Sequence, residues 1–440
     1  MRNLPHGNDR FHLSKAMMSR LQRIVPGGSH TYAKGDDQFP ERAPGLLARG
    51  HGCRVWDADG NEFIEYGMGL RSVTLGHAEP RVIEAVAAAL PLGTNFTRPS
   101  IKELECAEAF LDIVPGAEMV KFTKDGSTAV SAAVKLARKH TGRTLVAIAA
   151  EHPFFSYDDW FIRTTSMHGG IPEQQETLTF RYNALDSVRA LFQAHPGKIA
   201  AVVLEAARTD EPAAGFLQGL QAICRQEGAV LIFDEMITGF RWNLGGAQAE
   251  YGVTPDLSTF GKALANGFSV SALCGSRELM RLGSRERPCD DVFLLSTTHG
   301  AETTGLAAAL ATMRIYRTEP VVEHLHRQGK RLAEGVGNVA RRRGVDGHFK
   351  VLGRSCNLLY ATTGPDGQPS QALRTLFMQE LIARGVIAPS FVVSYAHTDA
   401  DIDRTIEAVD GALEIYARAL EDGAERHLIG APSRVVFGRR

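Results

Sequence analysis

Two short motifs carry side chains that could perform chemistry, an acidic pair and a lysine further along the chain. Asp234 and Glu235 follow the apolar run 230–233, whose length and β-branched residues indicate a buried parallel strand. A second apolar stretch, 257–260, leads into Gly261 and Lys262. In an open α/β sheet, functional side chains gather at the carboxyl ends of the strands. We therefore expect Asp234 and Lys262 to face one site.

Two kinds of chemistry fit these motifs. Pyridoxal phosphate (PLP) is held by a lysine through a Schiff base, and its pyridine nitrogen pairs with an Asp. An acidic pair after a strand also occurs in Walker-B magnesium sites, so the two motifs alone leave both interpretations open. The nucleotide-binding alternative loses support because no Gly-x-x-x-x-Gly-Lys-Ser/Thr turn follows an early strand.

A third segment has the composition of an anion site. The expected strand 119–122 is followed by a polar turn with Gly126, Ser127 and Thr128, and then by the Ala-rich helix 129–140. Free backbone N–H groups, the helix dipole and hydroxyl groups converge at such a helix start, where they favour phosphate. Ser and Thr are also frequent there as simple N-caps, so the turn alone does not decide between the two interpretations.

The surrounding pattern predicts the elements that position these residues. Further strands at 145–149 and 200–204 alternate with helices, which indicates a mostly parallel sheet. Glu205 ends the second of these strands as Asp234 ends its own, and we expect it to contribute to the cofactor site. The other expected elements are a helix at 10–25, a hairpin at 55–66, and helices at 81–90, 103–114, 184–192, 216–226, 303–316, 322–332 and 402–419.

Composition narrows the functional class. With 440 residues, 44% hydrophobic and 22% charged, the chain has room for two or three globular domains. A net charge of −1 gives no electrostatic reason to expect nucleic acid or an anionic membrane as a partner. The six cysteines form no Cys-x-x-Cys pair, so we expect no metal site and a reducing cytoplasm. We also expect no membrane span and no signal peptide.

Several longer motifs resemble one family. The strongest runs from Phe233-Asp234-Glu235-x-x-Thr238-Gly239-Phe240-Arg241 through Gly246-Ala247-Gln248 and Tyr251-Gly252-Val253-Thr254-Pro255-Asp256-Leu257 to Gly261-Lys262. Others are Pro26-Gly27-Gly28, Trp56-Asp57-x-Asp59-Gly60, Leu75-Gly76-His77, Ser394-x-Ala396-His397 and Asp401-Ile402-Asp403. With these motifs the chain resembles the class III, fold-type I PLP-dependent aminotransferases, and most closely their glutamate-1-semialdehyde aminomutase branch.

The resemblance implies a fold and an assembly. It implies an α/β, fold-type I PLP-dependent transferase, whose three-layer large domain holds a mostly parallel seven-stranded sheet. A small α+β domain is expected from both termini. The expected boundaries are 1–85 for the N-terminal segment, 86–320 for the large domain and 321–440 for the C-terminal small domain. The resemblance also implies a homodimer whose active sites lie at the subunit interface.

It also implies roles for individual residues. Lys262 corresponds to the Schiff-base lysine, and Asp234 corresponds to the partner of the pyridine nitrogen. Gly126 and Ser127 correspond to the turn that binds the phosphate. Thr298 corresponds to the threonine that reaches this phosphate from the other subunit.

The aromatic residue that stacks on the cofactor ring is harder to place. The segment 151–155, Glu-His-Pro-Phe-Phe, departs from the Tyr-His-Gly pattern of the family. We take His152 as the counterpart, with Phe154 as the second choice.

The substrate side of the site departs from the aminomutases. Lys34 stands where they carry an arginine, and a lysine is a point charge rather than a bidentate fork. Arg71 and Arg98 replace small residues, and Glu302 follows the segment with Thr298. We expect these four residues to bind substrate. The alternatives are structural or surface arginines, and for Glu302 an acid at a helix N-terminus.

The prediction is therefore a transaminase with a small-molecule amino donor. It would move an amino group, by ping-pong half-reactions, onto the aldehyde or ketone of a polar or anionic acceptor such as a sugar or a biosynthetic intermediate. One alternative is glutamate-1-semialdehyde 2,1-aminomutase itself, which forms 5-aminolevulinate. Another is a PLP-binding protein without catalysis, which the retained Lys262 and Asp234 disfavour.

Overall fold

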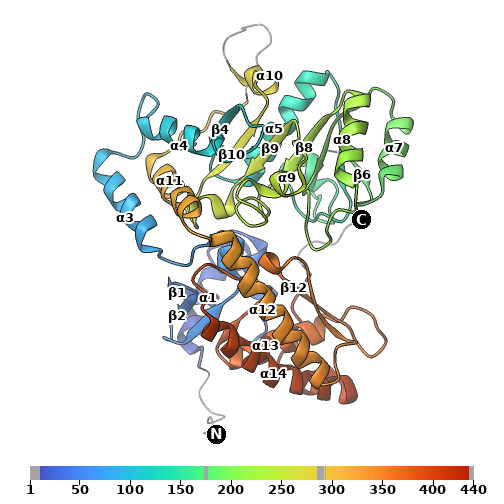
Figure 1. The fold of residues 1–440 in the computed structure, drawn as a ribbon. Helices are drawn as coiled ribbons and strands as arrows, with labels where there is room; N and C mark the ends of the chain where they lie inside the picture. The colour runs from blue at the N-terminus through green and yellow to red at the C-terminus, as the bar shows by residue number, and fades with distance from the viewer. Residues whose placement is uncertain (1–9, 173–176, 285–291, 293, 436–440) are drawn as a thin grey trace. The chain divides into compact units, whose positions relative to one another are not determined.

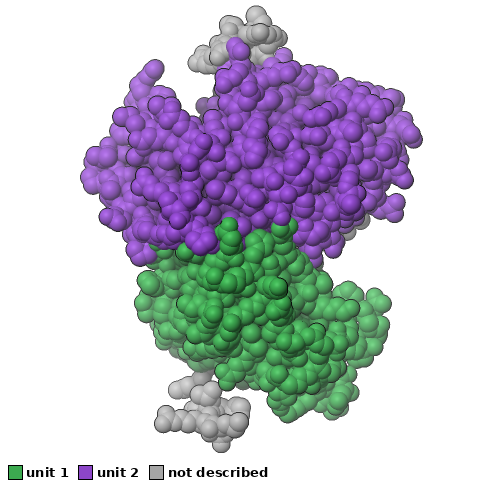
Figure 2. Space-filling view, viewed as in Figure 1, with its two compact units in different colours: residues 1–70, 74–79, 323–436 green, residues 71–73, 80–322, 437–440 purple. Residues whose placement is uncertain are grey.

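The computed structural model describes residues 10–172, 177–284, 292 and 294–435 (Figure 1). The chain divides into two compact units, coloured separately in Figure 2. Unit 1 contains residues 1–70, 74–79 and 323–436, and unit 2 contains residues 71–73, 80–322 and 437–440. Unit 1 thus draws on both ends of the chain, as the resemblance implied for the small domain. The main divisions between the units fall after residue 79 and after residue 322, and the domain boundaries at 85 and 320 remain predictions.

Unit 2 is built on a seven-stranded sheet with the order β4-β10-β9-β8-β7-β5-β6. Only β10 runs antiparallel to its neighbours β4 and β9, and the other pairs are parallel. Its strands are β4 (Met119–Thr123), β5 (Leu145–Ala149), β6 (Thr177–Phe180), β7 (Ile199–Leu204), β8 (Val230–Asp234), β9 (Leu257–Phe260) and β10 (Ser271–Gly275). Its principal helices are α3 (Pro80–Ala89), α4 (Ile101–Leu111), α5 (Gly126–Thr141), α7 (Leu185–Ala194), α8 (Phe216–Glu227) and α11 (Thr303–Thr318). Its shorter helices are α6 (Asp159–Ile162), α9 (Gly246–Tyr251) and α10 (Arg277–Met280).

Both faces of this sheet are covered, which explains why its central strands are continuously apolar. Along β5, Val146 and Ile148 belong to the hydrophobic core that contains α5. Leu145 and Ala147 point to the other face and join the core formed with α7 and α8. This period-two alternation places one helical layer on each side of the sheet. The fold prediction of a three-layer α/β transferase with a seven-stranded sheet is confirmed.

Unit 1 combines a four-stranded sheet, order β1-β2-β3-β13, with long helices. The short strand β13 pairs in parallel with β3, so that Val386 lies beside Ile64 and joins the two ends of the chain. A separate ribbon pairs β11 with β12. The elements of unit 1 are α1 (His12–Gln22), β1 (Leu47–His51), β2 (Arg54–Asp57), β3 (Glu62–Glu65), β11 (Phe349–Leu352), β12 (Leu359–Thr362), α13 (Gln371–Ala383), β13 (Val386–Ile387) and α14 (Asp399–Asp422). Two further helices, α2 (Met68–Arg71) and α12 (Val321–Arg342), begin in one unit and end in the other.

Several elements differ from their expected extents. Helix α5 begins at Gly126 rather than at residue 129, so the polar turn already belongs to its first turn. Helix α12 continues to Arg342, ten residues beyond the expected end at 332. Strands β1, β6 and β10 were not expected. The polar segment 29–39 contains two single-turn 3₁₀ helices, Tyr32–Lys34 and Asp36–Gln38.

Candidate active site

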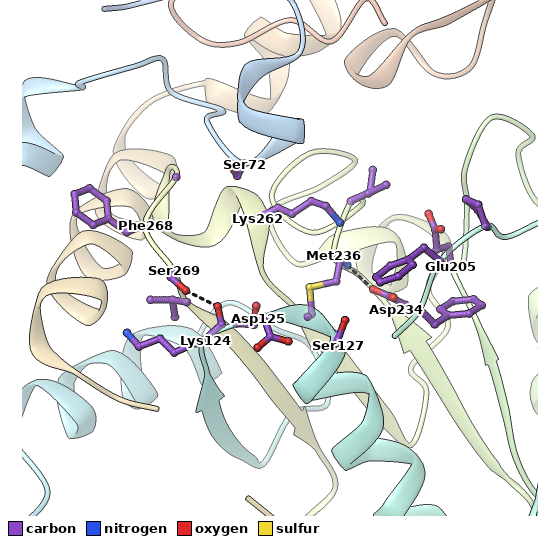
Figure 3. Close-up of a pocket in the computed structure, with 18 of the residues that line it drawn as sticks. Ser72, Lys124, Asp125, Ser127, Glu205, Asp234, Met236, Lys262, Phe268 and Ser269 are labelled. Atoms are coloured by element: carbon purple, nitrogen blue, oxygen red, sulfur yellow. Dashed lines mark hydrogen bonds between the residues drawn. The ribbon is translucent and has the colours of Figure 1, made fainter. Parts of the chain in front are cut away.

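Asp234 and Lys262 line one cavity of unit 2, with a volume of about 380 Å³ (Figure 3). Asp234 is the last residue of β8, and only 4% of its surface is exposed. Lys262 follows β9 at the start of a short 3₁₀ helix. Its side chain extends across the cavity toward the side where Asp234 and Glu205 lie. The structure therefore brings together the residues that end three adjacent parallel strands.

The environment of Asp234 disfavours its charged form. Its Oδ1 accepts a hydrogen bond of 2.9 Å from the backbone N–H of Met236. Burial, followed by the nearby Glu205, raises the pKa of Asp234 to about 7, although Lys262 acts in the opposite direction. A cationic group of a ligand placed beside this carboxyl would favour the ionised form. The site is therefore suited to pair with a protonated ring nitrogen.

Lys262 has the reverse electrostatics. Burial lowers the pKa of its ammonium, and the charges of Arg71 and Arg241 act in the same direction. Asp234 and Glu205 oppose this shift. A lowered pKa increases the fraction of the neutral amine, which is the nucleophilic form. The cavity thus supports covalent chemistry at Nζ of Lys262.

The backbone around Lys262 is unusual and tightly packed. Lys262 has φ of +45°, in the left-handed region that side-chain-bearing residues rarely adopt. At the preceding Gly261, an added Cβ would lie 2.6 Å from Sδ of Met236. At Gly126 an added Cβ would lie 2.8 Å from the same sulfur. Because both glycines contact Met236, its thioether joins the lysine turn to the start of α5.

The N-terminus of α5 forms an anion cradle. Asp125 is the N-cap, and its carboxylate accepts hydrogen bonds from the backbone N–H and the hydroxyl of Thr128, at 2.8 and 2.9 Å. The backbone N–H groups of Gly126 and Ser127 have no hydrogen-bond partner within the described part of the chain. Asp125, Gly126 and Ser127 all line the cavity. Two available N–H groups at the start of a 16-residue helix fit a phosphate.

Glu205 is the third acid of the cavity, and 5% of its surface is exposed. Its Oε1 lies 3.7 Å from Nε of Arg208. Its Oε2 is buried and has no hydrogen-bond partner among the described residues. Burial raises the pKa of Glu205, whereas Arg208, Lys262 and Arg71 act to lower it. An orphaned buried oxygen at a cavity wall indicates that a ligand supplies its partner.

The two candidates for the ring-stacking residue have different surroundings. Nδ1 of His152 accepts the backbone N–H of Glu205 at 3.0 Å, and the imidazole is 1% exposed. His152 is absent from the residues that line the cavity, whereas Phe154 lines it and is 40% exposed. Phe154 is held edge-to-face by Phe161, with ring centroids 5.6 Å apart. The cavity lining thus includes the second choice, Phe154, and not His152, and the identity of the ring-stacking residue remains a prediction.

Glu302 has a structural role in this chain. It is the N-cap of α11, and its carboxylate accepts the backbone N–H groups of Thr304 and Gly305. It also forms an ion pair of 2.7 Å with Lys124, which lines the cavity. Burial opposes the shift, but the hydrogen bonds from Lys124 and from the helix start lower the pKa of Glu302 to about 2. Of the two interpretations of Glu302, the structure matches the helix N-terminal acid.

Arg71 lies within the electrostatic reach of the acids in the cavity. It follows a left-handed stretch, with φ of +58° at Leu70 and +72° at Arg71 itself. Its carbonyl accepts a hydrogen bond of 2.6 Å from Nη2 of Arg241. Burial, then Arg241 and Arg208, lowers the pKa of Arg71 to about 10, while Glu205 opposes the shift. At neutral pH Arg71 therefore remains a cation near Glu205.

Three other predicted residues lie outside the cavity lining. Arg98 and Thr298 are exposed, and Asn95 donates to the carbonyl of Thr298 at 3.1 Å, which connects their two segments. Lys34 is exposed and belongs to unit 1. The substrate-binding roles of Arg98 and Lys34 remain predictions, as does the role of Thr298 at the phosphate of another subunit.

Arg208 and Met236 are among the cavity residues that were not anticipated from the sequence. Arg208 lies three residues after Glu205, in the loop that leaves β7. Met236 lies two residues after Asp234. The strand-end rule that located Glu205 and Asp234 could have been extended to the next few residues of each loop. Within the described ranges, no helix is long and apolar enough to cross a membrane, and no group of three His, Cys, Asp or Glu residues could hold a metal ion.

The sequence of this chain is similar to those of known proteins. The family described as aminotransferase class III matches residues 37–412. A glutamate-1-semialdehyde 2,1-aminomutase from Acetivibrio thermocellus is 34% identical over 422 residues, which cover 90% of this chain and 96% of that protein.

Two solved structures of proteins similar to this chain are described as a PLP-containing protein and as a transaminase. The FumI protein of Sphingopyxis sp., described as a PLP internal aldimine form, has a TM-score of 0.84 and 28% identity, covering 93% of this chain and 97% of its own. An omega-transaminase from Sphaerobacter thermophilus has a TM-score of 0.81 and 28% identity, covering 92% of this chain and 98% of its own.

Proposed function

The chain belongs to the class III aminotransferase family, and from this premise we propose that it is a PLP-dependent transaminase. It transfers an amino group from a small-molecule donor to the aldehyde or ketone of a polar or anionic acceptor, in two half-reactions. When bound, PLP supplies an aldehyde that exchanges amino groups and a ring that withdraws electrons from the reacting carbon.

One observation carries the proposal: three groups that PLP requires lie around one cavity. Lys262 offers an amine, Asp234 a carboxyl for the ring nitrogen, and the start of α5 two N–H groups for the phosphate. In the protein alone, two of these three groups are in an unfavourable environment or lack a hydrogen-bond partner. Asp234 has a raised pKa, and the N–H groups of Gly126 and Ser127 have no partner among the described residues. The residues present therefore fit the cofactor.

The chain's own residues then have distinct tasks. Nζ of Lys262 would hold the cofactor between turnovers, and its free amine would carry the proton at the reacting carbon. Asp234 stabilises a proton on the ring nitrogen, which is a preorganised electrostatic effect. Phe154 covers the cavity from the segment after β5, and the side chain of Met236 packs between the two turns that hold the cofactor's ends.

A second candidate function is glutamate-1-semialdehyde 2,1-aminomutase. The observation that favours it is the 34% identity over most of the chain to a protein of that name. Against it stand the substrate-side departures, above all Lys34 in place of an arginine and the engagement of Glu302 as a helix cap. Rapid conversion of glutamate-1-semialdehyde to 5-aminolevulinate by the purified enzyme would establish this alternative.

The test of the proposed function is a spectroscopic donor and acceptor screen. The purified protein is expected to show the visible absorbance of lysine-bound PLP, and a productive donor shifts this spectrum to the pyridoxamine form. Addition of a productive acceptor restores the original spectrum.

Lys262→Ala should lose both the visible absorbance and turnover, because Lys124, the other lysine of the described cavity lining, is held in an ion pair with Glu302. Lys198→Ala serves as a control with the same substitution. Lys198 directly precedes β7, at the opposite end of that strand from Glu205. Full activity of Lys262→Ala would contradict the proposed function.

A further inference from the structure

The loop after β7 presents a pair of charged side chains to the cavity, Glu205 and Arg208. Glu205 is almost fully buried, with 6% of its side chain exposed, whereas Arg208 is 27% exposed. Their closest atoms, Oε1 and Nε, are 3.7 Å apart, which is an ionic contact longer than a hydrogen bond. The proposed half-reactions assign no task to Arg208.

Most N–H donors of the Arg208 guanidinium make no hydrogen bond to a described residue. Its Nη1 donates to the backbone carbonyl of Glu151 at 3.2 Å, and this is its one side-chain hydrogen bond to a described residue. A guanidinium carries five N–H donors in a fixed planar fork. One edge of Arg208 is thus anchored to the segment after β5, while the remaining N–H groups are available at the cavity wall.

Several charged groups lie around Glu205. Arg208, Lys262 and Arg71 all act on the carboxyl of Glu205. Asp234 is a second carboxylate close to Glu205, and among the described residues that line the cavity Arg208 is the one guanidinium. Lys124, the other lysine of the described lining besides Lys262, is paired with Glu302 and lies on the opposite side of the cavity from Glu205 in Figure 3.

Glu205 adds a second indication that a ligand binds here. Its Oε2 is buried without a hydrogen-bond partner among the described residues, beside the cavity. Leaving such an oxygen unsatisfied is unfavourable, so a polar group of a bound molecule belongs next to it. An available guanidinium fork and an orphaned carboxyl oxygen on the same loop therefore require a ligand that offers both an oxyanion and a hydrogen-bond donor.

We propose that Arg208 is a specificity-determining residue that binds a carboxylate or phosphate group of the substrate, with Glu205 beside it accepting a hydrogen bond from the same molecule. The inference rests on the proposed transaminase function and narrows its substrate class to molecules that carry an oxyanion. Arginine suits planar oxyanions because two parallel N–H groups can bind two oxygens at once.

The competing explanation is that Arg208 only holds its loop against the carbonyl of Glu151. Two variants separate these roles. Arg208→Gln keeps an N–H donor for that carbonyl but removes the charge and the fork. Arg208→Lys keeps the charge without the fork. Arg189→Gln on α7 is the matched control, because Arg189 is exposed and pairs only with its helix neighbour Asp186 among the described residues.

The experiment measures donor half-saturation in the first half-reaction, by the absorbance change of the enzyme-bound cofactor. Four amines are compared: L-glutamate, L-alanine, O-phosphoethanolamine and the uncharged-tail amine 1-phenylethylamine. In Arg208→Gln we expect half-saturation to rise about 10- to 100-fold for the preferred oxyanion-bearing donor, the range for losing one charge-assisted hydrogen bond. Half-saturation for 1-phenylethylamine should not change. Preference for glutamate or for O-phosphoethanolamine in the wild type identifies carboxylate or phosphate.

Binding of unreactive anions provides a readout independent of turnover. The dissociation constants of glutarate and inorganic phosphate are measured by calorimetry on the PLP-loaded enzyme. Arg208→Gln should weaken the anion that the wild type binds, Arg208→Lys should weaken it less, and Arg189→Gln should not change it. Equal losses for charged and uncharged donors, or no binding of either anion to the wild type, would overturn the inference. Absence of lysine-bound PLP absorbance in the wild type would instead overturn the proposed function itself.

Discussion

At the scale of single residues, Asp234 illustrates a group whose environment suits the bound state better than the protein alone. Burial and the nearby Glu205 raise its pKa to about 7, so at neutral pH ionisation is resisted. A folded-state pKa raised above the unfolded value contributes stability at low pH, and this contribution is lost as the pH rises through the folded pKa. The acid therefore destabilises the cofactor-free protein in mildly alkaline solution.

We predict that Asp234→Asn raises the thermal unfolding midpoint of the cofactor-free enzyme at pH 8. The difference from the wild type should shrink as the pH falls from about 7 toward about 4, because the wild-type carboxyl then becomes protonated in the folded state. Thermal unfolding across this pH range measures the effect, and PLP-loaded turnover should fall in the same variant. A wild type that is more stable than the variant at pH 8 would contradict the assignment.

The site residues that could be predicted from the sequence are those that directly follow a recognisable strand. Asp234, Glu205 and Lys262 each follow a strand, and parallel strands bring their carboxyl ends together. His152 and Phe154 lie in an irregular segment after β5, where no periodicity tells which side chain turns outward. Arg208 escaped prediction for the same reason, since its approach to the cavity depends on the path of the loop after β7.

At the scale of elements, the N-cap residue of α11, Glu302, contacts the cavity-lining residue Lys124. Glu302 caps the helix through the N–H groups of Thr304 and Gly305 and fixes Lys124 through an ion pair of 2.7 Å. The helix dipole and the cation both favour the carboxylate, which is why the pKa of Glu302 falls to about 2 despite its partial burial. This stabilisation is present above the ordinary pKa of a glutamate and is lost as the pH falls through about 2.

Glu302→Ala should therefore destabilise the protein by about 1 kcal/mol, the usual cost of removing an N-cap. Urea denaturation at neutral pH measures this loss. Donor half-saturation, measured with the cofactor loaded, should stay within twofold of the wild type, at about the assay's precision, because we expect Glu302 to cap α11 rather than to bind substrate. Thr318→Ala, at the other end of α11, controls for a general loss of helix stability. A donor-specific rise in half-saturation would restore Glu302 as a substrate residue.

Strands whose own sequence is a long apolar run could be predicted. Strands that form only by pairing with a segment far away in the sequence could not. The strands β5, β7 and β8 are apolar runs of typical length, and their buried faces explain their composition. Strand β10 reads Ser-Ala-Leu-Cys-Gly and is a strand because it inserts between β4 and β9. The two-residue strand β13 exists only through its pairing with β3. Such pairings are long-range events that a local pattern does not record.

At the scale of the whole molecule, Thr298 is a predicted cofactor-site residue that lies away from the cavity of its own chain. Thr298 is exposed and does not line the cavity of its own chain. The family resemblance gives this threonine a task at the phosphate of a second subunit. We therefore propose that the active enzyme is a homodimer whose sites each use Thr298 from the other chain. The amphipathic pattern of the sequence could not supply this, because an interface between copies leaves the same local signal as a core.

We predict that Thr298→Ala weakens PLP binding about 10-fold, as expected for one lost hydrogen bond to a charged group, while the dimer mass in light scattering is unchanged. Thr297→Ala is the adjacent control. Mixing Lys262→Ala subunits with Thr298→Ala subunits gives the sharper test. A mixed dimer contains one complete site, so the absorbance of lysine-bound PLP should reappear at a limiting PLP concentration. No recovery on mixing would contradict a threonine shared between subunits.

The left-handed backbone at Lys262, with φ of +45°, has a consequence for how this enzyme can change under selection. A non-glycine residue in a sparsely populated conformation costs on the order of 1 to 3 kcal/mol. Glycine would occupy the same place without that cost. Selection for heat resistance alone would therefore remove the lysine, and only selection for chemistry keeps it. At position 262, laboratory evolution for thermal stability would therefore favour glycine, whereas laboratory evolution for activity would favour lysine.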